Sequence, residues 1–148
     1  MKFNIAALLF TFTLVLFSCS EKADRNTLMF SNYLLKEFKT RIPDSLHYYI
    51  LLPKIACKGC SVSTLNEMDK LVRPETQRYF TFISTNEHVI PEDLKIARFF
   101  QFDAHGRLDD LDIGIANVTI IKTQASRVIF IKPVYADEKR SLSEIITF

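Results

Sequence analysis

Residues 46–68 read LHYYILLPKIACKGCSVSTLNEM, and this stretch decides the fold. Residues 46–52 are almost uniformly apolar and rich in β-forming side chains, which predicts a strand buried on both faces of a sheet. Pro53 ends that run, and a short loop leads to a C-x-x-C pair. Beyond the pair, apolar residues recur at helical spacing until Pro74, which predicts a helix. The cysteines therefore lie where a buried strand gives way to a helix.

The rest of the chain predicts further alternating elements. We expect helices over residues 27–41, 91–100 and 137–148, and strands over residues 79–84, 118–123 and 127–132. The first two strands are joined through a helix and should be parallel, whereas the last two form an antiparallel hairpin. This order, α-β-α-β-α-β-β-α, predicts an α/β sheet with helices on both faces.

The N-terminus indicates export from the cytoplasm. Lys2 precedes an apolar stretch over residues 5–17, which is short for a membrane span and typical of a secretory signal. The stretch ends in LFSC at residues 16–19, which resembles the bacterial lipobox, whose cysteine carries acyl chains and becomes the new N-terminus. The alternative is a plain secretory signal with an incidental cysteine.

The lipobox resemblance implies a division of the chain. Residues 1–18 would be the signal peptide, residues 19–26 the lipidated Cys19 and a polar tether, and residues 27–148 a single domain. Acyl chains attach a protein firmly to a membrane, and disulfides persist outside the cytoplasm. Of the 3 cysteines, lipidation of Cys19 leaves Cys57 and Cys60 as one pair.

Composition excludes a nucleic-acid partner. Lys2 is removed with the signal peptide, so 18 of the 19 basic residues remain against 17 acidic ones. A balance this close to neutral, without a basic cluster, is not the pattern of a nucleic-acid-binding surface. The 13 Phe and 5 Tyr supply a substantial apolar core for one domain.

A strand, a C-x-x-C pair at a helix start, a strand, a helix, a hairpin and a final helix resemble the thioredoxin-like fold. The resemblance covers residues 27–148, and VIFIKPV at residues 128–134 is similar to strand endings of thioredoxin-like lipoproteins of the Bacteroidota. It implies a central mixed sheet of about four strands flanked by helices. It also implies a monomeric envelope protein, lipid-anchored in the outer membrane or facing the periplasm, that exchanges disulfides with protein thiols.

The chemistry of the pair agrees with that resemblance. A thiolate is the attacking species in disulfide exchange, and a helix N-terminus lowers a thiol pKa. Cys57, flanked by Lys54 and Lys58, is the candidate nucleophile, and Cys60 is the candidate resolving thiol. Gly59 keeps the turn between them narrow. The dithiol itself carries the electrons, so no dissociable cofactor is expected. Whether the protein reduces, oxidises or isomerises its partners depends on its redox potential and stays open.

Two positions depart from the thioredoxin pattern. Ala56 stands where thioredoxins carry Trp before the first cysteine, and the chain has no Trp. Val118 takes the position of the proline whose cis peptide bond faces the active site in the family. A non-proline cis bond costs about 3 kcal/mol, so we expect a trans bond at Val118.

Other readings of the cysteines remain open. The pair could be a permanent disulfide in a non-catalytic thioredoxin-like binding protein. Residues 56–71 are also locally similar to copper chaperones of βαββαβ form, although Ile55 stands where those proteins usually have Met. A structural zinc site needs four ligands, and His47, His88 and His105 are dispersed. The acidic residues between 103 and 112 do not match a calcium loop and predict a solvated loop.

Overall fold

The computed structural model describes residues 24–56, 58–86, 99–135 and 142–147, without the side chains of Lys58, Cys60 and Asp69. The strands are β1 (His47–Leu52), β2 (Phe80–Ser84), β3 (Phe100–Phe102), β4 (Thr119–Gln124) and β5 (Arg127–Pro133). The helices are α2 (Lys58–Leu71), the one-turn η1 (Gln77–Tyr79) and α4 (Leu142–Ile145). A helix over residues 24–38, which we name the N-terminal helix, precedes β1.

The five strands form one mixed sheet in the order β3-β2-β1-β4-β5. As predicted, β1 and β2 are parallel neighbours joined through α2, and β4 and β5 form an antiparallel hairpin. β4 also pairs antiparallel with β1. A parallel β-α-β unit beside a hairpin with a final helix is the thioredoxin-like arrangement, and the fold class predicted from the sequence is confirmed. The βαββαβ order of a copper chaperone is not the order of the described elements.

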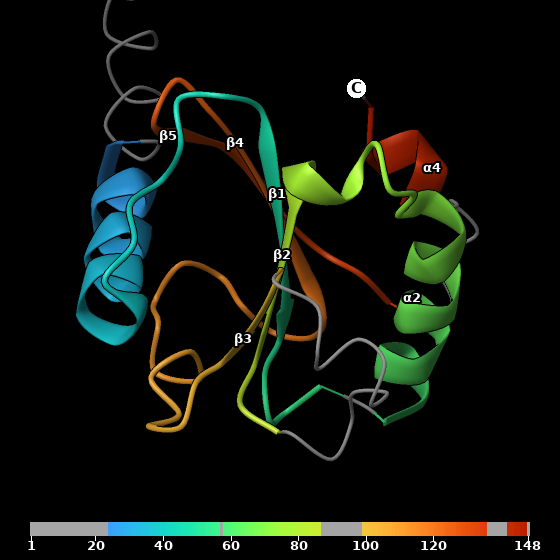
Figure 1. Ribbon diagram of the computed structural model, residues 1–148. Coiled ribbons are helices and arrows are strands. Elements are labelled where there is room, and N and C mark those ends of the chain that lie inside the picture. Colours follow the sequence, from blue (N-terminus) through green and yellow to red (C-terminus); the bar gives the residue numbers. More distant parts are fainter. Residues whose placement is uncertain (1–23, 57, 87–98, 136–141, 148) are drawn as a thin grey trace, which may run out of the picture.

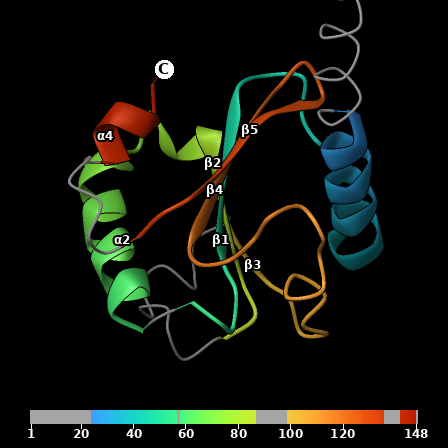
Figure 2. The ribbon, with the colours of Figure 1, turned by 180° about the vertical axis from the view of Figure 1, so that it is seen from behind.

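The central strand β1 is buried on both faces, as its composition predicts. Side chains alternate along it, so Tyr48, Ile50 and Leu52 pack with α2 and α4, whereas Tyr49 and Leu51 pack with the N-terminal helix. Figures 1 and 2 show α2 and α4 on one face of the sheet and the N-terminal helix on the other. Two apolar cores therefore share β1 as their common wall.

The sheet has five strands where about four were expected, because β3 adds a strand beside β2. Phe82 pairs with Phe100 and Ser84 with Phe102 in a parallel register. Phe100 was expected at the end of a helix over residues 91–100, most of which lies outside the described residues. The aromatic run from 99 to 102 favours a strand, and the open edge of β2 supplies hydrogen-bond partners for it.

The N-terminal helix differs from its prediction in bounds and in orientation. It includes residues 24–26, which were assigned to the tether, and it ends at residue 38, where Lys39 takes a left-handed conformation with φ 58°. Helical spacing of Leu28, Leu34, Leu35 and Phe38 in the sequence predicts one inward face, yet Leu28 and Leu35 are 61% and 46% exposed. Leu34 is buried, as the spacing predicts, and Phe30 and Tyr33 share the buried face with it. Aromatic side chains thus take the positions against the sheet.

The free edge of the sheet at β5 is irregular. Lys122 pairs with Phe130 and Thr123 with Val128, so no residue of β4 pairs with Ile129. This extra residue is a β-bulge, and its side chain is 55% exposed. The N–H group of Val128 donates to Thr27 Oγ1 at 3.0 Å, which joins the start of the N-terminal helix to this edge.

The C-terminal segment is held against β1. The terminal helix predicted over residues 137–148 is a single turn, α4, within the described part of that range. Tyr48 donates its hydroxyl proton to the carbonyl oxygen of Thr147 at 2.6 Å and accepts the Thr147 N–H at 3.0 Å. Among the described ranges, none of the helices combines the length and the hydrophobicity that a membrane crossing requires.

Burial places a titratable side chain at the start of the central strand. His47 Nε2 lies 2.9 Å from Thr81 Oγ1, and the ring centroids of His47 and Tyr49 are 4.8 Å apart. Desolvation lowers the pKa of His47 from 6.5 to about 4. The unfolded chain therefore binds a proton at this histidine at a higher pH than the folded chain does.

We predict that the domain loses stability as the pH falls from 6.5 to about 4, because protonation of His47 favours the unfolded chain. This loss amounts to at most about 3 kcal/mol. Urea unfolding at each pH measures it, with His47→Gln as a comparison that keeps a polar side chain near Thr81 but does not titrate. The pH dependence should be shallower in the variant; identical pH profiles would contradict the prediction.

Candidate functional site

Three strand ends lie together at one end of the sheet, beside the segment that carries the cysteine pair. β1 and β2 are parallel and end there, with Leu52 beside Ser84, and the antiparallel β4 begins there, with Leu51 beside Thr119. α2 begins at Lys58, close to this end of the strands, after a short loop that follows β1. The sequence therefore leads from the middle of the sheet through Cys57 directly into α2.

The structure describes the backbone around the pair but not its sulfur atoms. Cys57 lies outside the described residues, and Lys58 and Cys60 are placed only as backbone in the first turn of α2. That turn contains no acidic residue. Unpaired N–H groups and the helix dipole at such a position favour a negative charge, and no carboxylate of the turn opposes it. The predicted helix start after the first cysteine is therefore present in the backbone.

The loop before Cys57 is held by two hydrogen bonds. The N–H of Ala56 donates to the carbonyl oxygen of Pro53 at 3.0 Å, which closes a tight turn. The N–H of Lys54 donates to Asp109 Oδ1 at 2.8 Å. Ala56, at the position of the usual Trp, packs partly buried against the core, whereas Ile55 is 64% exposed. Sequence reasoning missed Asp109, because nothing local links residues 55 positions apart.

The end of β1 is also tied to the end of β2. Ser84 is fully buried, and its Oγ accepts the N–H of Asn86 at 3.0 Å and lies 3.4 Å from the carbonyl oxygen of Leu52. The N–H of Thr85 donates to that same Leu52 oxygen at 3.3 Å. The chain entering the cysteine loop thus starts from a fixed point.

Val118 lies at the same end of the sheet as the last residues of β1, as its alignment with the family proline predicts. It is fully buried immediately before β4, and its carbonyl oxygen accepts the N–H of Val134 at 2.7 Å. The described residues contain no cis peptide bond, so the expected trans bond at Val118 is confirmed. A Cβ added to Gly59 would meet no described atom within 4 Å, and Gly59 is not in the left-handed region.

A buried polar cluster holds the loop that supplies Asp109. Asp103 was expected in a solvated loop, but it is 1% exposed. Its Oδ2 accepts the Tyr33 hydroxyl at 3.0 Å and the Leu108 N–H at 2.7 Å, and its Oδ1 accepts the His105 N–H at 3.2 Å. A buried carboxylate requires such donors, which explains the difference from the prediction. The D-x-x-G pattern over residues 103–106, with Gly106 at φ 67°, was the available sequence signal for a turn.

Burial raises the pKa of Tyr33, and the neighbouring Asp103 raises it further. The Tyr33 hydroxyl therefore keeps its proton and acts as a donor to Asp103. The N-terminal helix and the loop after β3 are joined through this pair.

The same cluster contains three possible metal ligands, Glu37, Asp103 and His105, whose ligand atoms lie within 4.8 Å of one another. Each carboxylate already has partners. Glu37 Oε1 lies 2.6 Å from His105 Nδ1, and Glu37 Oε2 lies 3.5 Å from the guanidinium of Arg107. A cation would compete with these contacts. We therefore infer that the cluster joins the N-terminal helix to the loop after β3.

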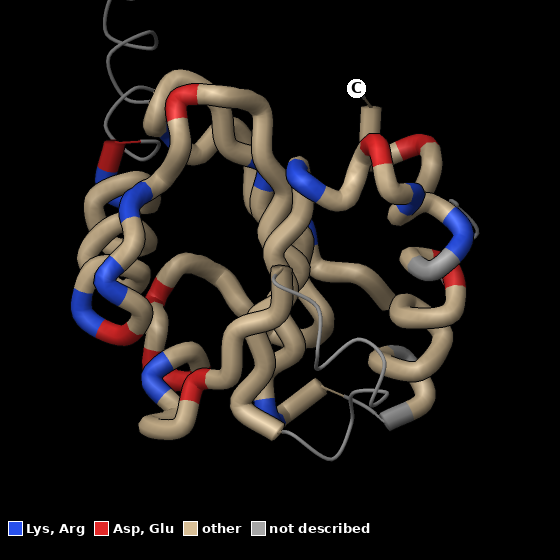
Figure 3. The backbone as a smooth tube through the Cα atoms, in the orientation of Figure 1, with Lys and Arg blue, Asp and Glu red and all other residues tan. Residues whose placement is uncertain are grey.

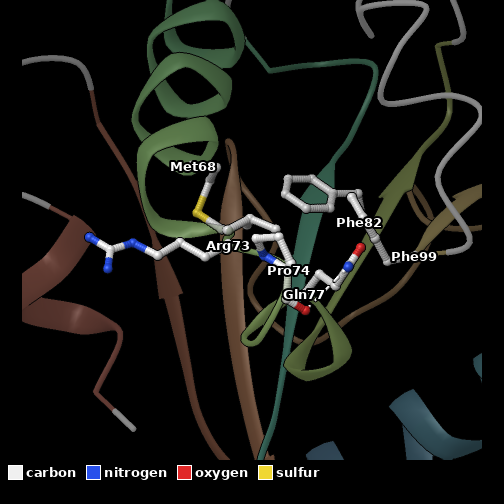
Figure 4. A pocket seen from close by; sticks show the side chains of 7 residues that line it. Met68, Arg73, Pro74, Gln77, Phe82 and Phe99 are labelled. Carbon is white, nitrogen blue, oxygen red and sulfur yellow. Dashed lines mark hydrogen bonds between the residues drawn. The ribbon is translucent and has the colours of Figure 1, made fainter.

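A pocket of about 210 Å³ lies between the end of α2 and β2 (Figure 4). Its lining residues are Met68, Val72, Arg73, Pro74, Gln77, Phe82 and Phe99. In Figure 4 the Arg73 guanidinium points away from the ring of Phe82, which leaves mainly apolar walls. Lys58 and Met68 are separated by about 15 Å along a helix, so this pocket is remote from the cysteine pair.

The comparisons with known proteins do not identify a family for the chain. No protein-family model and no curated protein matches the chain. Among solved structures, Mycobacterium tuberculosis AhpC matches with 15% sequence identity, a TM-score of 0.38 and coverage of 70% of either chain. The thioredoxin-like assignment accordingly rests on the strand order, the parallel unit and the placement of helices on the two faces.

We predict that Tyr33→Phe lowers the free energy of unfolding by about 1–2 kcal/mol, because it removes a donor from the buried Asp103 carboxylate. Urea unfolding measures the loss, and faster hydrogen exchange at the Leu108 and Lys54 amides should report loosening of the loop. Tyr135→Phe, at a side chain 47% exposed, is the matched control and should change stability by less than about 0.5 kcal/mol. Equal stability of the two variants would show that the Asp103 contact contributes nothing.

Proposed function

We propose that this chain is a lipid-anchored thiol-disulfide oxidoreductase of the cell envelope, in which Cys57 attacks and Cys60 resolves. One observation carries the proposal. α2 begins at Lys58, immediately after Cys57, at the carboxyl end of a central strand that is buried on both faces. A cysteine at this place combines a helix N-terminus with a rigid support, which are the conditions for a stabilised thiolate.

The exchange has two steps in which atoms and electrons balance. The Cys57 thiolate attacks one sulfur of a disulfide in a partner protein; the partner's S–S bond breaks, and its other sulfur leaves as a thiolate that takes a proton. Cys60, as a thiolate, then attacks the Cys57 sulfur of the mixed disulfide and releases the second partner thiol. The partner gains two electrons, and the Cys57–Cys60 pair becomes a disulfide. The reverse sequence oxidises a partner dithiol.

Two features around the pair support this reading, and two substitutions relative to the family change its surroundings. The first turn of α2 lacks acidic residues, and Lys54 and Lys58 add positive charge in the sequence nearby. The loop before Cys57 is fixed by Pro53 and Asp109. Ala56 and Val118 replace the family's Trp and cis-proline, so we expect a different partner surface beside the thiol.

The anchor and the location are supported by the sequence alone. LFSC at residues 16–19 places Cys19 at a lipobox position, and residues 1–23 lie outside the described residues. On this reading the signal peptide, residues 1–18, is removed, and the domain works in the envelope as a lipoprotein similar to those of the Bacteroidota. Its partners are protein thiols or disulfides of that compartment.

Thiol titration tests the chemistry. Iodoacetamide alkylation of the reduced full-length Cys60→Ser protein, followed over a pH range, should give an apparent pKa for Cys57 well below the ~8.5 of a free cysteine. The Cys57→Ser protein, which keeps Cys60, is the matched control and should react with an ordinary pH dependence.

The wild-type pair should also be reduced by dithiothreitol and reoxidised by a disulfide-bonded protein, and both single variants should lose the second reaction. A pair that resists reductant would indicate a static disulfide in a binding protein. Stoichiometric Cu(I) binding without any exchange would indicate the metal-binding alternative. Either result overturns the oxidoreductase proposal.

A further inference from the structure

The N-terminal helix carries apolar side chains on the side that faces away from the protein. Leu28 and Leu35 are 61% and 46% exposed, and they are two helical turns apart, so they lie on one line along the helix. Asn32 between them is also exposed, whereas Tyr33 and Leu34 point into the core. We name Leu28, Asn32 and Leu35 the outer line.

Basic side chains flank the outer line. Arg25, Lys36 and Lys39 are exposed, and basic residues lie at both ends of this helix in Figure 3. Arg25 forms an exposed ion pair with Asp112 at 2.8 Å, which leaves Lys36 and Lys39 as the stronger positive charges of this face.

Within the N-terminal helix itself, acidic side chains oppose these charges only weakly. Of the two acidic residues within residues 24–38, Glu37 faces inward, with its side chain 5% exposed and paired with His105. Asp24, at the start of the helix, is the exposed one. The outward side of the helix is therefore apolar along its middle and positively charged toward its C-terminal end.

We propose that the outer line rests on the surface of an anionic lipid bilayer. Exposed leucines with flanking lysines are the pattern of a helix that lies in a membrane interface, and basic residues near an anionic surface strengthen its attachment. The inference rests on the lipid anchor of the proposed function. The five residue-to-residue steps from Cys19 to residue 24 span at most about 18 Å, so an acylated Cys19 keeps the helix close to the bilayer.

This contact would set the direction in which the cysteine pair faces. The N-terminal helix and α2 lie on opposite faces of the sheet (Figures 1 and 2). The N-terminal helix also starts at the opposite end of the strands from the start of α2. Thr27 contacts Val128, and Val128 pairs with Thr123, which is the partner of His47 at the start of β1. With about 10 Å between packed layers, the start of α2 lies roughly 20 Å from the bilayer surface. The partners that reach Cys57 are then soluble envelope proteins or domains projecting well above the lipid.

A tryptophan probe tests the contact, because the chain contains no Trp of its own. The full-length lipidated Leu35→Trp protein is reconstituted into vesicles of phosphatidylglycerol and phosphatidylethanolamine, with and without brominated acyl chains. Its emission should shift to the blue, and bromine should quench it by roughly half. The matched control is Val62→Trp, at a side chain 45% exposed on α2, which should show neither change. Leu28→Trp provides a second probe if Leu35→Trp folds poorly by circular dichroism.

Charge reversal tests the electrostatic part of the contact. Lys36→Glu combined with Lys39→Glu should reduce the quenching measured in the Leu35→Trp protein, and added salt should do the same when both lysines are kept. Vesicles that bind the protein but leave the Leu35→Trp emission as unquenched as the Val62→Trp emission would overturn the inference while leaving the anchor in place.

Vesicle flotation separates the membrane contact from the anchor: wild type should float and Cys19→Ser should not. A wild-type protein that fails to float removes both the anchor and the membrane contact. The alkylation of Cys57 judges the redox chemistry independently of either result.

Discussion

Burial of β1 on both faces is the constraint on which the rest of this structure depends. Tyr48 to Leu52 are all 5% exposed or less, and their side chains alternate between two apolar cores. Because parallel β2 and antiparallel β4 flank β1, the last residues of β1 and β2 and the first residues of β4 lie at the same end of the sheet. The chain leaves β1 at that end and begins α2 at Lys58, so the position of the helix start that follows Cys57 in the sequence depends on the most confined strand of the sheet.

The main elements could be predicted because their signals are local. Uninterrupted apolar runs indicated β1, β2 and the hairpin, and Pro53 and Pro74 marked where elements end. β3 was missed because a three-residue strand exists only through the open edge of β2. The inward face of the N-terminal helix was wrong at Leu28 and Leu35, since spacing alone does not choose between leucine and aromatic stripes on the same helix.

The candidate site, too, could be predicted from the sequence only where its signals are local. Cys57, Cys60 and Val118 could be named from a motif and an alignment of elements. The hydrogen bonds that hold their surroundings could not, because Tyr33 meets Asp103 across 70 positions and Lys54 meets Asp109 across 55. Such contacts form only when the N-terminal helix and the loop after β3 pack on the same face of the sheet. The motif that would carry the proposed chemistry is thus local in the sequence, whereas the contacts that support its surroundings join distant residues.

The bulge at Ile129 affects how neighbouring molecules can contact one another through the outer strand β5. A regular outer strand would offer its backbone to the outer strand of a neighbour, and sheets would join from one molecule to the next. Here the extra residue breaks the spacing, Thr27 occupies the Val128 amide, and Pro133 ends the strand without a donor. At the β5 edge, therefore, the sheet does not offer a regular strand on which a second copy could continue it.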